Sequence, residues 1–227
     1  MSSPPYTRLA LFDLDNTLLT GDSDVLWCEF LIQCGRLNAA AFGAANADMD
    51  HRYRAGKASA AEFCEFYVSL LKGIARSDGE ALRQKFFREW VRPRIPDDAR
   101  TLVEKHRSRG EVLILTTATN RFITELTARE LDIEHLIAIE TETIDDVFTG
   151  KAVGVLNMRE GKVIRLAQWL AARGWAESLM KEATFYSDSI NDLPLLSAVA
   201  NPIAVDPDSS LAREALRRGW PTLALGR

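Results

Sequence analysis

Residues 11–19 read LFDLDNTLL, an apolar segment that carries two aspartates one residue apart, Asp13 and Asp15. The residues before Asp13 favour β-structure and predict a buried strand whose carboxyl end presents both aspartates. Alternate residues of an extended chain point to the same side, so these carboxylates would lie close together and repel each other. Because a cation between them would relieve the repulsion, the segment predicts a metal site.

The composition favours a globular chain with a substantial core. Of its 227 residues 47% are apolar, and 28 basic and 32 acidic residues give a net charge of −4. Nothing resembles the basic stripe that nucleic-acid binding needs, so we expect no nucleic-acid partner. The opening MSSPPYTR lacks a secretory pattern, and no stretch approaches the roughly 20 apolar residues of a membrane span. We therefore expect a cytoplasmic protein without a membrane partner.

Residues 22–91 have only helical patterns. The first predicted helix could be capped by Ser23 or Asp24, the third by Ser59, and the fourth by Ser77 with Glu80 completing a capping box. Two prolines in RPRIPDD, residues 92–98, then resist both helix and central strand. The pattern predicts a helical insertion after the first strand.

Strands and helices alternate in the rest of the chain. Residues 143–154 carry β-branched residues around a glycine-containing turn and indicate a hairpin. The predicted strands are residues 111–117, 135–142, 182–188, 201–207 and 221–225, and the predicted helices are residues 97–110, 120–132, 160–174, 191–199 and 209–219. Such alternation predicts an α/β fold: a Rossmann-like parallel sheet with helices on both faces and an inserted helical domain.

Polar side chains follow three of these strands. Asp13 and Asp15 end the first, the threonines of TTATN (residues 116–120) end the second, and Asp188 with Asp192 end a later one. Ligands of open parallel sheets bind at the carboxyl ends of the strands. Carboxylates gathered there suit Mg²⁺, which also coordinates phosphate oxygens, so we expect a magnesium site for a phosphorylated ligand.

The order and spacing of these motifs resemble the haloacid dehalogenase (HAD) superfamily of phosphatases. FDLDNTLL (residues 12–19) is similar to its first motif, VLILTT (112–117) to its second, Lys162 to its third and YSDSINDLPLL (186–196) to its fourth. The fourth motif departs from the family pattern, because Tyr-Ser stands where many members have glycine. The resemblance covers nearly the whole chain and implies the HAD fold.

The resemblance implies a role for each matched residue. Asp13 would be the nucleophile and Asp15 the general acid and base, while Thr117, or Thr116 beside it, and Lys162 would bind phosphate. Asp13, Asp15 through its backbone carbonyl, and Asp188 would hold Mg²⁺. The residues expected to support the metal or substrate are Asn191 and Asp192.

The position of the helical insertion resembles the small C1-type cap of the phosphoserine phosphatase group, subfamily IB. Asp22 falls where those enzymes hold the substrate amine, but Tyr67 falls where they place an arginine for its carboxylate. An amine-bearing ester without a carboxylate, such as histidinol phosphate, therefore fits better than phosphoserine, unless Arg52 or Arg54 supplies the missing cation. Asp22 could instead cap a helix, and Tyr67 could pack within the cap.

These inferences together predict a Mg²⁺-dependent phosphatase that acts on a small phosphorylated metabolite. Its core domain would comprise residues 1–20 and 93–227, and its cap residues 21–92. A phosphotransferase or phosphomutase would use the same aspartates, and a non-catalytic metal- or phosphate-binding module would share the fold. Monomer and homodimer remain open.

Overall fold

Strand β1 (Leu9–Phe12) is the central strand of a seven-stranded sheet, and all four of its residues are buried. The computed structural model describes residues 8–55 and 57–226. The sheet order is β4-β3-β2-β1-β5-β6-β7, with every neighbouring pair parallel except β3 and β4. The other strands are β2 (Val112–Asn120), β3 (His135–Ile144), β4 (Val147–Val153), β5 (Thr184–Ser187), β6 (Asn201–Val205) and β7 (Thr222–Leu223).

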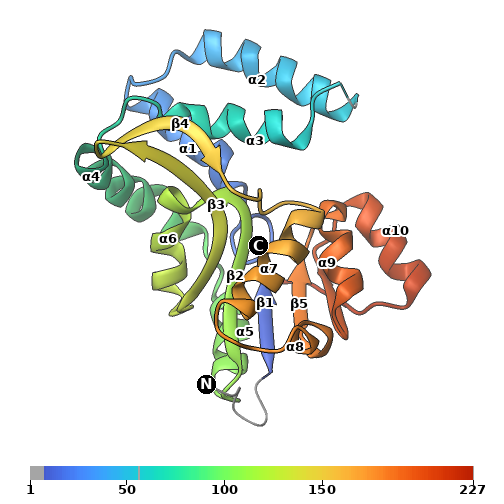
Figure 1. Ribbon diagram of the computed structural model, residues 1–227. Helices are drawn as coiled ribbons and strands as arrows, with labels where there is room; N and C mark the ends of the chain where they lie inside the picture. The colour runs from blue at the N-terminus through green and yellow to red at the C-terminus, as the bar shows by residue number, and fades with distance from the viewer. Residues whose placement is uncertain (1–7, 56, 227) are drawn as a thin grey trace.

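Helices cover both faces of this sheet (Figure 1). The helices are α1 (Ser23–Gln33), α2 (Ala39–Arg54), α3 (Ala60–Val68), α4 (Arg76–Phe86), α5 (Asp97–Arg107), α6 (Arg121–Glu130), α7 (Glu160–Ala171), α8 (Ser178–Glu182), α9 (Leu193–Ala198) and α10 (Ser209–Arg218). Short helical turns occupy Ser69–Leu71, Arg92–Arg94 and Ile190–Asp192, and a π-helical turn follows α4 at Phe87–Val91. The α/β fold predicted from the sequence is confirmed.

Alternate side chains of β1 point to opposite faces of the sheet and belong to two separate hydrophobic clusters. Ala10 and Phe12 face a cluster that includes residues of α1, α4, α5 and α6. Leu9 and Leu11 face the other side, where residues of α7, α8, α9 and α10 pack. Because successive side chains of a strand point to opposite faces, one short apolar strand contributes to both clusters.

The helical insertion follows β1, as the sequence predicts. Trp27 of α1 and Phe86 of α4 belong to the same cluster as Phe12, so these two helices are packed into the main core. Helix α3 lies next to β4 beyond the end of the sheet, and α2 packs on α3 (Figure 1). Stacking of Tyr53 on Phe63, with ring centroids 4.5 Å apart, joins α2 to α3.

The predicted hairpin is formed by β3 and β4, and it is bonded to the insertion. The backbone N–H of Phe148 donates to the carbonyl of Ile74 at 3.0 Å, and the N–H of Gly73 donates to the carbonyl of Phe148 at 2.9 Å. Phe148 is buried against Phe122 of α6. The hairpin thus fixes the segment before α4 to the sheet.

Two of the predicted helix caps differ in the structure. Asp22, rather than Ser23 or Asp24, caps α1 by accepting from the N–H groups of Asp24 and Val25. The capping box of Ser59 with Glu62 begins α3, and the prediction of Ser59 is confirmed.

The prediction that Ser77 caps the fourth helix is wrong. Helix α4 starts at Arg76 with Ala75 as its N-cap residue, so Ser77 lies within the first turn, and the N–H of Arg76 donates to the carbonyl of Asp146 in the hairpin. A tertiary contact satisfies the donor that a cap would have satisfied. Glu80 bonds to Arg83 and Gln84 instead of completing a box.

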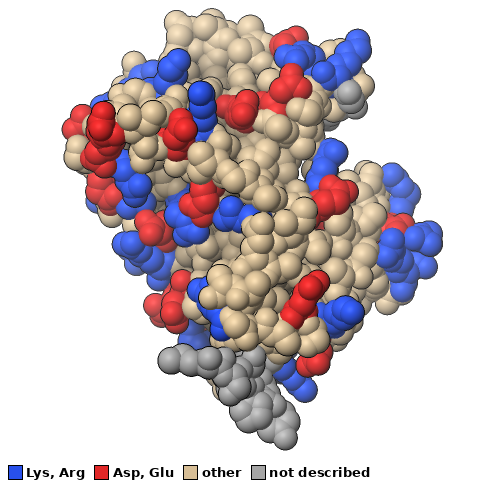
Figure 2. Space-filling model, in the orientation of Figure 1, with Lys and Arg blue, Asp and Glu red and all other residues tan. Residues whose placement is uncertain are grey.

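Charged residues of both signs are interspersed over the face in Figure 2, without a stripe of one sign. Within the described ranges, no helix has the combination of length and apolarity that crossing a bilayer requires. Residues 1–7, which the sequence analysis placed in the core domain, lie outside the described residues.

Candidate active site

A cavity of ≈350 Å³ lies where the carboxyl ends of the strands meet the inserted helices. The core contributes Asp13 and Asp15 after β1 and two segments of loop and helix, residues 158–162 and 188–192. The insertion contributes Asp22 and Asp24 near the start of α1 and aromatic side chains of α2 and α3. The segments that carry the sequence motifs therefore meet at this cavity.

Lys162 joins two of the predicted site residues. Its Nζ donates to Oδ1 of Asp13 and to Oδ2 of Asp192, both at 2.7 Å, and its side chain is 2% exposed. Burial alone would lower the pKa of Lys162, but Asp13 and Asp192 outweigh it and raise the pKa above its usual value. An ammonium group is therefore held beside the predicted nucleophile.

Asp188 and Asp192 occupy different positions at the end of β5. Asp192 is buried, and its Oδ2 also accepts from the hydroxyl of Ser187 at 2.7 Å. Asp188 accepts from the hydroxyl of Thr17 at 3.2 Å. Burial, together with the charge of Asp192, raises the pKa of Asp188 to about 7. Negative charge at this end of the cavity thus exceeds what the single ammonium of Lys162 offsets.

Asp15 is held by groups on both sides of it. Its Oδ1 accepts from the backbone N–H of Ser23 at 2.7 Å, and its Oδ2 accepts from the hydroxyl of Thr119 at 2.9 Å. The hydroxyl of Thr117 is farther away, 3.4 Å from Oδ2. The first turn of α1 and the end of β2 therefore fix the orientation of this carboxylate.

The two adjacent threonines of the second motif have different environments. Thr116 accepts a hydrogen bond from the buried Asn157 at 3.0 Å, whereas the Thr117 hydroxyl accepts from the N–H of Thr119 and approaches Asp15. Thr117 is thus the one that faces the predicted catalytic carboxylate.

Asn157 is a site-supporting residue that the sequence analysis missed. Its side-chain amide donates to Oγ1 of Thr116 and to the backbone carbonyls of Thr117 and Ile137, at 2.9–3.0 Å. These bonds tie the loop before α7 to β2 and β3. An isolated asparagine has no motif around it, so only the fold reveals this function.

Arg159 was also missed, and it sits at the edge of the cavity. Its backbone has φ 50° and ψ −126°, a conformation that is strained for a residue with a side chain. Its guanidinium donates to the hydroxyl of Tyr53 in α2 at 2.7 Å. Arg159 therefore links the loop before α7 to the insertion.

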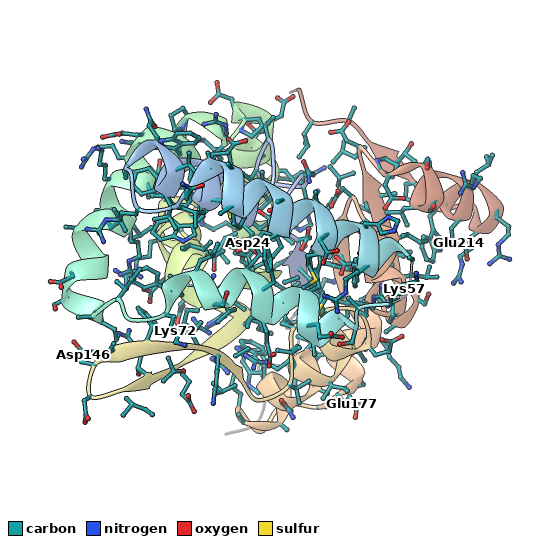
Figure 3. The ribbon with its side chains drawn as sticks, turned by 90° about the horizontal axis from the view of Figure 1, so that it is seen from above. Asp24, Lys57, Lys72, Asp146, Glu177 and Glu214 are labelled. Carbon is teal, nitrogen blue, oxygen red and sulfur yellow. The ribbon has the colours of Figure 1, made fainter. Side chains whose placement is uncertain are left out.

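The inserted helices place two carboxylates in the cavity. Figure 3 shows Asp24 near the centre of the molecule when it is seen from above, between α2 and α3 in that view. Burial, and next the charge of Asp15, raises the pKa of Asp22 to about 6. Burial, and next the charge of Asp22, raises the pKa of Asp24 well above its usual value. Asp22 was predicted from the sequence as a candidate substrate contact, whereas Asp24 was predicted only as a possible helix cap.

The remaining predicted residues are also located. Tyr67 lines the cavity and its hydroxyl donates to Asn46 at 2.9 Å, while Asn191 is exposed at the edge. Arg52, an alternative cation for a substrate carboxylate, pairs instead with Asp48 and Glu62. The side chain of Arg54, the other alternative, lies outside the described residues.

The described residues contain no group of three or more His, Cys, Asp or Glu side chains arranged to hold a metal ion by themselves. Magnesium does not need such a group, because it keeps several waters and is bound by one or two carboxylates with substrate phosphate oxygens. Asp13 and Asp188, both joined to the hydroxyl of Thr17, offer hard oxygen donors in a region of excess negative charge. The donor chemistry fits Mg²⁺.

Comparisons with known proteins agree with this architecture. A family model for haloacid dehalogenase-like hydrolases matches residues 10–197. A histidinol-phosphatase from Neisseria meningitidis serogroup C is 38% identical over 217 residues, which is 95% of this chain and 98% of that protein. Phosphoserine phosphatase SerB1 from Mycobacterium tuberculosis is 33% identical over 230 residues, 96% of this chain and 71% of that protein.

A solved structure is similar over nearly the whole fold. The crystal structure of a protein of unknown function from Bordetella pertussis Tohama I superposes with a TM-score of 0.91 at 41% identity, covering 96% of this chain and 99% of that one. The chain therefore belongs to the haloacid dehalogenase-like hydrolase family and is a phosphatase.

Proposed function

We propose that this phosphatase is Mg²⁺-dependent and hydrolyses the phosphate monoester of a small metabolite through an aspartyl-phosphate on Asp13. The observation that supports this most is the contact of Lys162 with Asp13 beside a separately held Asp15. Phosphoryl transfer needs an in-line nucleophile and neutralised charge, and these residues supply both.

Asp13 attacks phosphorus, and the bond from phosphorus to the alcohol oxygen breaks. Asp15 gives a proton to that leaving oxygen. It then takes a proton from the water that attacks the aspartyl-phosphate, so phosphate leaves and Asp13 is restored. Thr117 and Lys162 bind the phosphate oxygens in this scheme.

Asp13, Asp188 and the backbone carbonyl of Asp15 would hold the magnesium ion, with Asp192 and Asn191 in support. When bound, the ion supplies positive charge that reduces the repulsion between an anionic ester and a carboxylate nucleophile. The excess of carboxylates around Lys162 supports this assignment.

Histidinol phosphate is the first substrate to test. The N. meningitidis relative carries the name histidinol-phosphatase, and the cavity presents Asp22 to an amine. Phosphoserine is the second, after the name of the M. tuberculosis relative. No arginine stands at the cap position, where Tyr67 lies, and Arg52 is paired with Asp48 and Glu62, so Arg159 at the cavity edge is the cation that remains for its carboxylate.

Residues 21–92 would act as a cap over a core of residues 1–20 and 93–227. A cap must admit the ester and then exclude water from the phosphoryl step. The cavity lies beneath this cap, between α1, α3 and the carboxyl ends of the strands.

The test is phosphate release from histidinol phosphate, phosphoserine and 4-nitrophenyl phosphate with Mg²⁺. Asp13→Asn is the inactive control, and Asp97→Asn, at an exposed position in α5, is the matched control. Turnover that Asp13→Asn abolishes and Asp97→Asn retains supports the proposal. Equal turnover by Asp13→Asn contradicts it.

A further inference from the structure

The carboxylate of Asp208 joins two segments that the sequence motifs do not connect. Asp208 precedes α10, and its Oδ1 accepts from the N–H groups of Ser210 and Leu211 at 2.7 and 2.8 Å. Its Oδ2 accepts from the N–H of Ile190 at 2.7 Å, in the loop between the two aspartates of the fourth motif. One side chain therefore caps a helix and also holds the loop that carries Asp188.

A backbone bond links the same two segments in the reverse direction. The N–H of Asp208 donates to the carbonyl of Asp188 at 2.8 Å, whereas the N–H of Ile190 donates to the carboxylate of Asp208. The two bonds lie on either side of Ser189, so the turn at this residue is held at both of its ends. The backbone of Asp188, from which its carboxylate projects, is therefore fixed by Asp208.

Helix capping accounts for only one oxygen of Asp208. Asn38 and Ser59 cap α2 and α3 with a single side-chain oxygen each, which shows that one acceptor is enough to begin a helix in this chain. In Asp208 the capping acceptor is Oδ1, and Oδ2 bonds to Ile190. Serine or asparagine would serve the cap, but a carboxylate has an acceptor for each of the two segments.

The segment before Asp208 is itself tied to β7 and the residues after it. The N–H of Asp206 donates to the carbonyl of Leu223 at 2.9 Å, and the carboxylate of Asp206 accepts from the N–H of Leu225 at 3.1 Å. Leu225 is buried in the main hydrophobic cluster. The start of α10 thus has a fixed position relative to the sheet, and Asp208 holds the loop from that position.

The two aspartates of the fourth motif are held in different ways. Asp192 is fixed through its side chain, because its Oδ2 accepts from the ammonium of Lys162 at 2.7 Å. Asp188 has a longer side-chain contact, 3.2 Å from the hydroxyl of Thr17. Its placement depends more on its backbone, so the bonds from Asp208 matter most for this carboxylate.

We propose that Asp208 is a positioning residue that holds Asp188 in place for the magnesium ion. The inference rests on the phosphatase function proposed above and adds to it a determinant of metal affinity outside the four motifs. The described lining residues of the cavity do not include Asp208, so it acts through the backbone of the loop. Without this carboxylate the ion itself would have to order the loop, and the cost of that ordering would weaken its binding.

The experiment uses Mn²⁺ as the probe, because it takes the same oxygen ligands as Mg²⁺ and its free form is measured by electron paramagnetic resonance. The dissociation constant is measured without substrate for the unmodified protein and four variants. Asp208→Ser keeps a cap oxygen for α10 but is too short to reach Ile190, and Asp208→Asn has one acceptor for two segments. Ser209→Ala, at an exposed position of α10, is the matched control, and Asp188→Ala removes the proposed ligand.

We expect both Asp208 variants to bind Mn²⁺ about tenfold or more weakly, the scale for groups that support metal ligands. Ser209→Ala should bind it as the unmodified protein does. At saturating Mg²⁺, Asp208→Ser should approach the unmodified kcat for 4-nitrophenyl phosphate, because the bound ion then orders the loop. A purely structural role would lower the free energy of unfolding and leave the dissociation constant unchanged, and that result would overturn the proposal.

The amide of Ile190 gives a readout that needs no metal. Its hydrogen exchange should be faster in Asp208→Ser than in the unmodified protein, while the amides of Ser210 and Leu211 stay protected by the serine cap. Equal exchange at Ile190 in the two proteins would overturn the link from Asp208 to the loop. Unmodified protein that binds no Mn²⁺, or that binds it equally after Asp188→Ala, would instead contradict the magnesium site of the proposed function.

Discussion

Nζ of Lys162 donates to Oδ1 of Asp13 across 2.7 Å, although the two residues are 149 positions apart in the chain. The same ammonium reaches Asp192 at 2.7 Å, and all three side chains are buried. The sheet topology brings these residues together, because β1 and β5 are neighbours and α7 packs on the same face as α9.

Replacing the lysine should cost both stability and activity. In Lys162→Met the carboxylates of Asp13 and Asp192 lose their cation, and removing one partner of a buried ion pair typically costs about 3–5 kcal/mol. We expect a lower free energy of unfolding in urea and at least a hundredfold loss of kcat, the scale for one electrostatic group (about 10²–10³). Lys181→Met, at an exposed position in α8, should change neither, and an active Lys162→Met would refute the assignment.

Removal of divalent ions with a chelator should abolish activity without unfolding the protein. With excess EDTA we expect phosphate release to stop and far-UV circular dichroism to stay unchanged, because two hydrophobic clusters support the sheet independently of the site. Added Mg²⁺ should restore release. Full turnover after exhaustive chelation would show that no divalent ion is needed.

Asn157→Ala should destabilise the carboxyl ends of β2 and β3, which lie beside the site. The change removes an amide whose two protons are shared among Oγ1 of Thr116 and the carbonyls of Thr117 and Ile137, and it leaves both carbonyls without this donor. At about 0.5–1.5 kcal/mol for each of two hydrogen bonds, we expect a loss of about 1–3 kcal/mol in the free energy of unfolding in urea and a lower kcat. Asn201→Ala, at an exposed position in β6, is the control; equal stabilities of the two variants would contradict the role of Asn157.

Tyr53→Phe tests which part of the insertion moves. The change removes the acceptor of the Arg159 bond, which links α2 to the loop before α7. Because α1 and α4 share the main core, we expect faster amide hydrogen exchange only in α2 and α3, residues 39–68. Faster exchange in α1 and α4 as well would mean that residues 21–92 open as one unit.

Most of the fold could be predicted because the spacing of apolar residues and the position of turn residues indicate its strands and helices. The apolar run before Asp13 predicted the central strand, and regular alternation after residue 96 predicted the parallel sheet. The prediction for Ser77 failed because the hairpin carbonyl of Asp146 satisfies the first N–H of α4. Such a long-range bond leaves no local pattern in the sequence.

The site was predictable only in part for a related reason. Asp13, Asp15, Lys162 and Asp188 lie in ordered motifs, and the structure brings them to one cavity. Thr119 also lies in the TTATN segment predicted to end a strand at the site. Other residues reach the site through tertiary placement, and no spacing marks them: Asp24, Asn157 and Arg159. A buried asparagine or a strained arginine is recognised from its surroundings alone.

The most direct test of the central claim is detection of a phosphoryl group on Asp13. The enzyme is mixed with 4-nitrophenyl phosphate and Mg²⁺, quenched in acid within one turnover, digested with pepsin and analysed by mass spectrometry of peptides that cover residues 9–20. The account predicts a phosphoryl mass on Asp13 that appears and decays with turnover and is absent in Asp13→Asn. Turnover without a phosphoryl group on this segment, at times when product is forming, would contradict it.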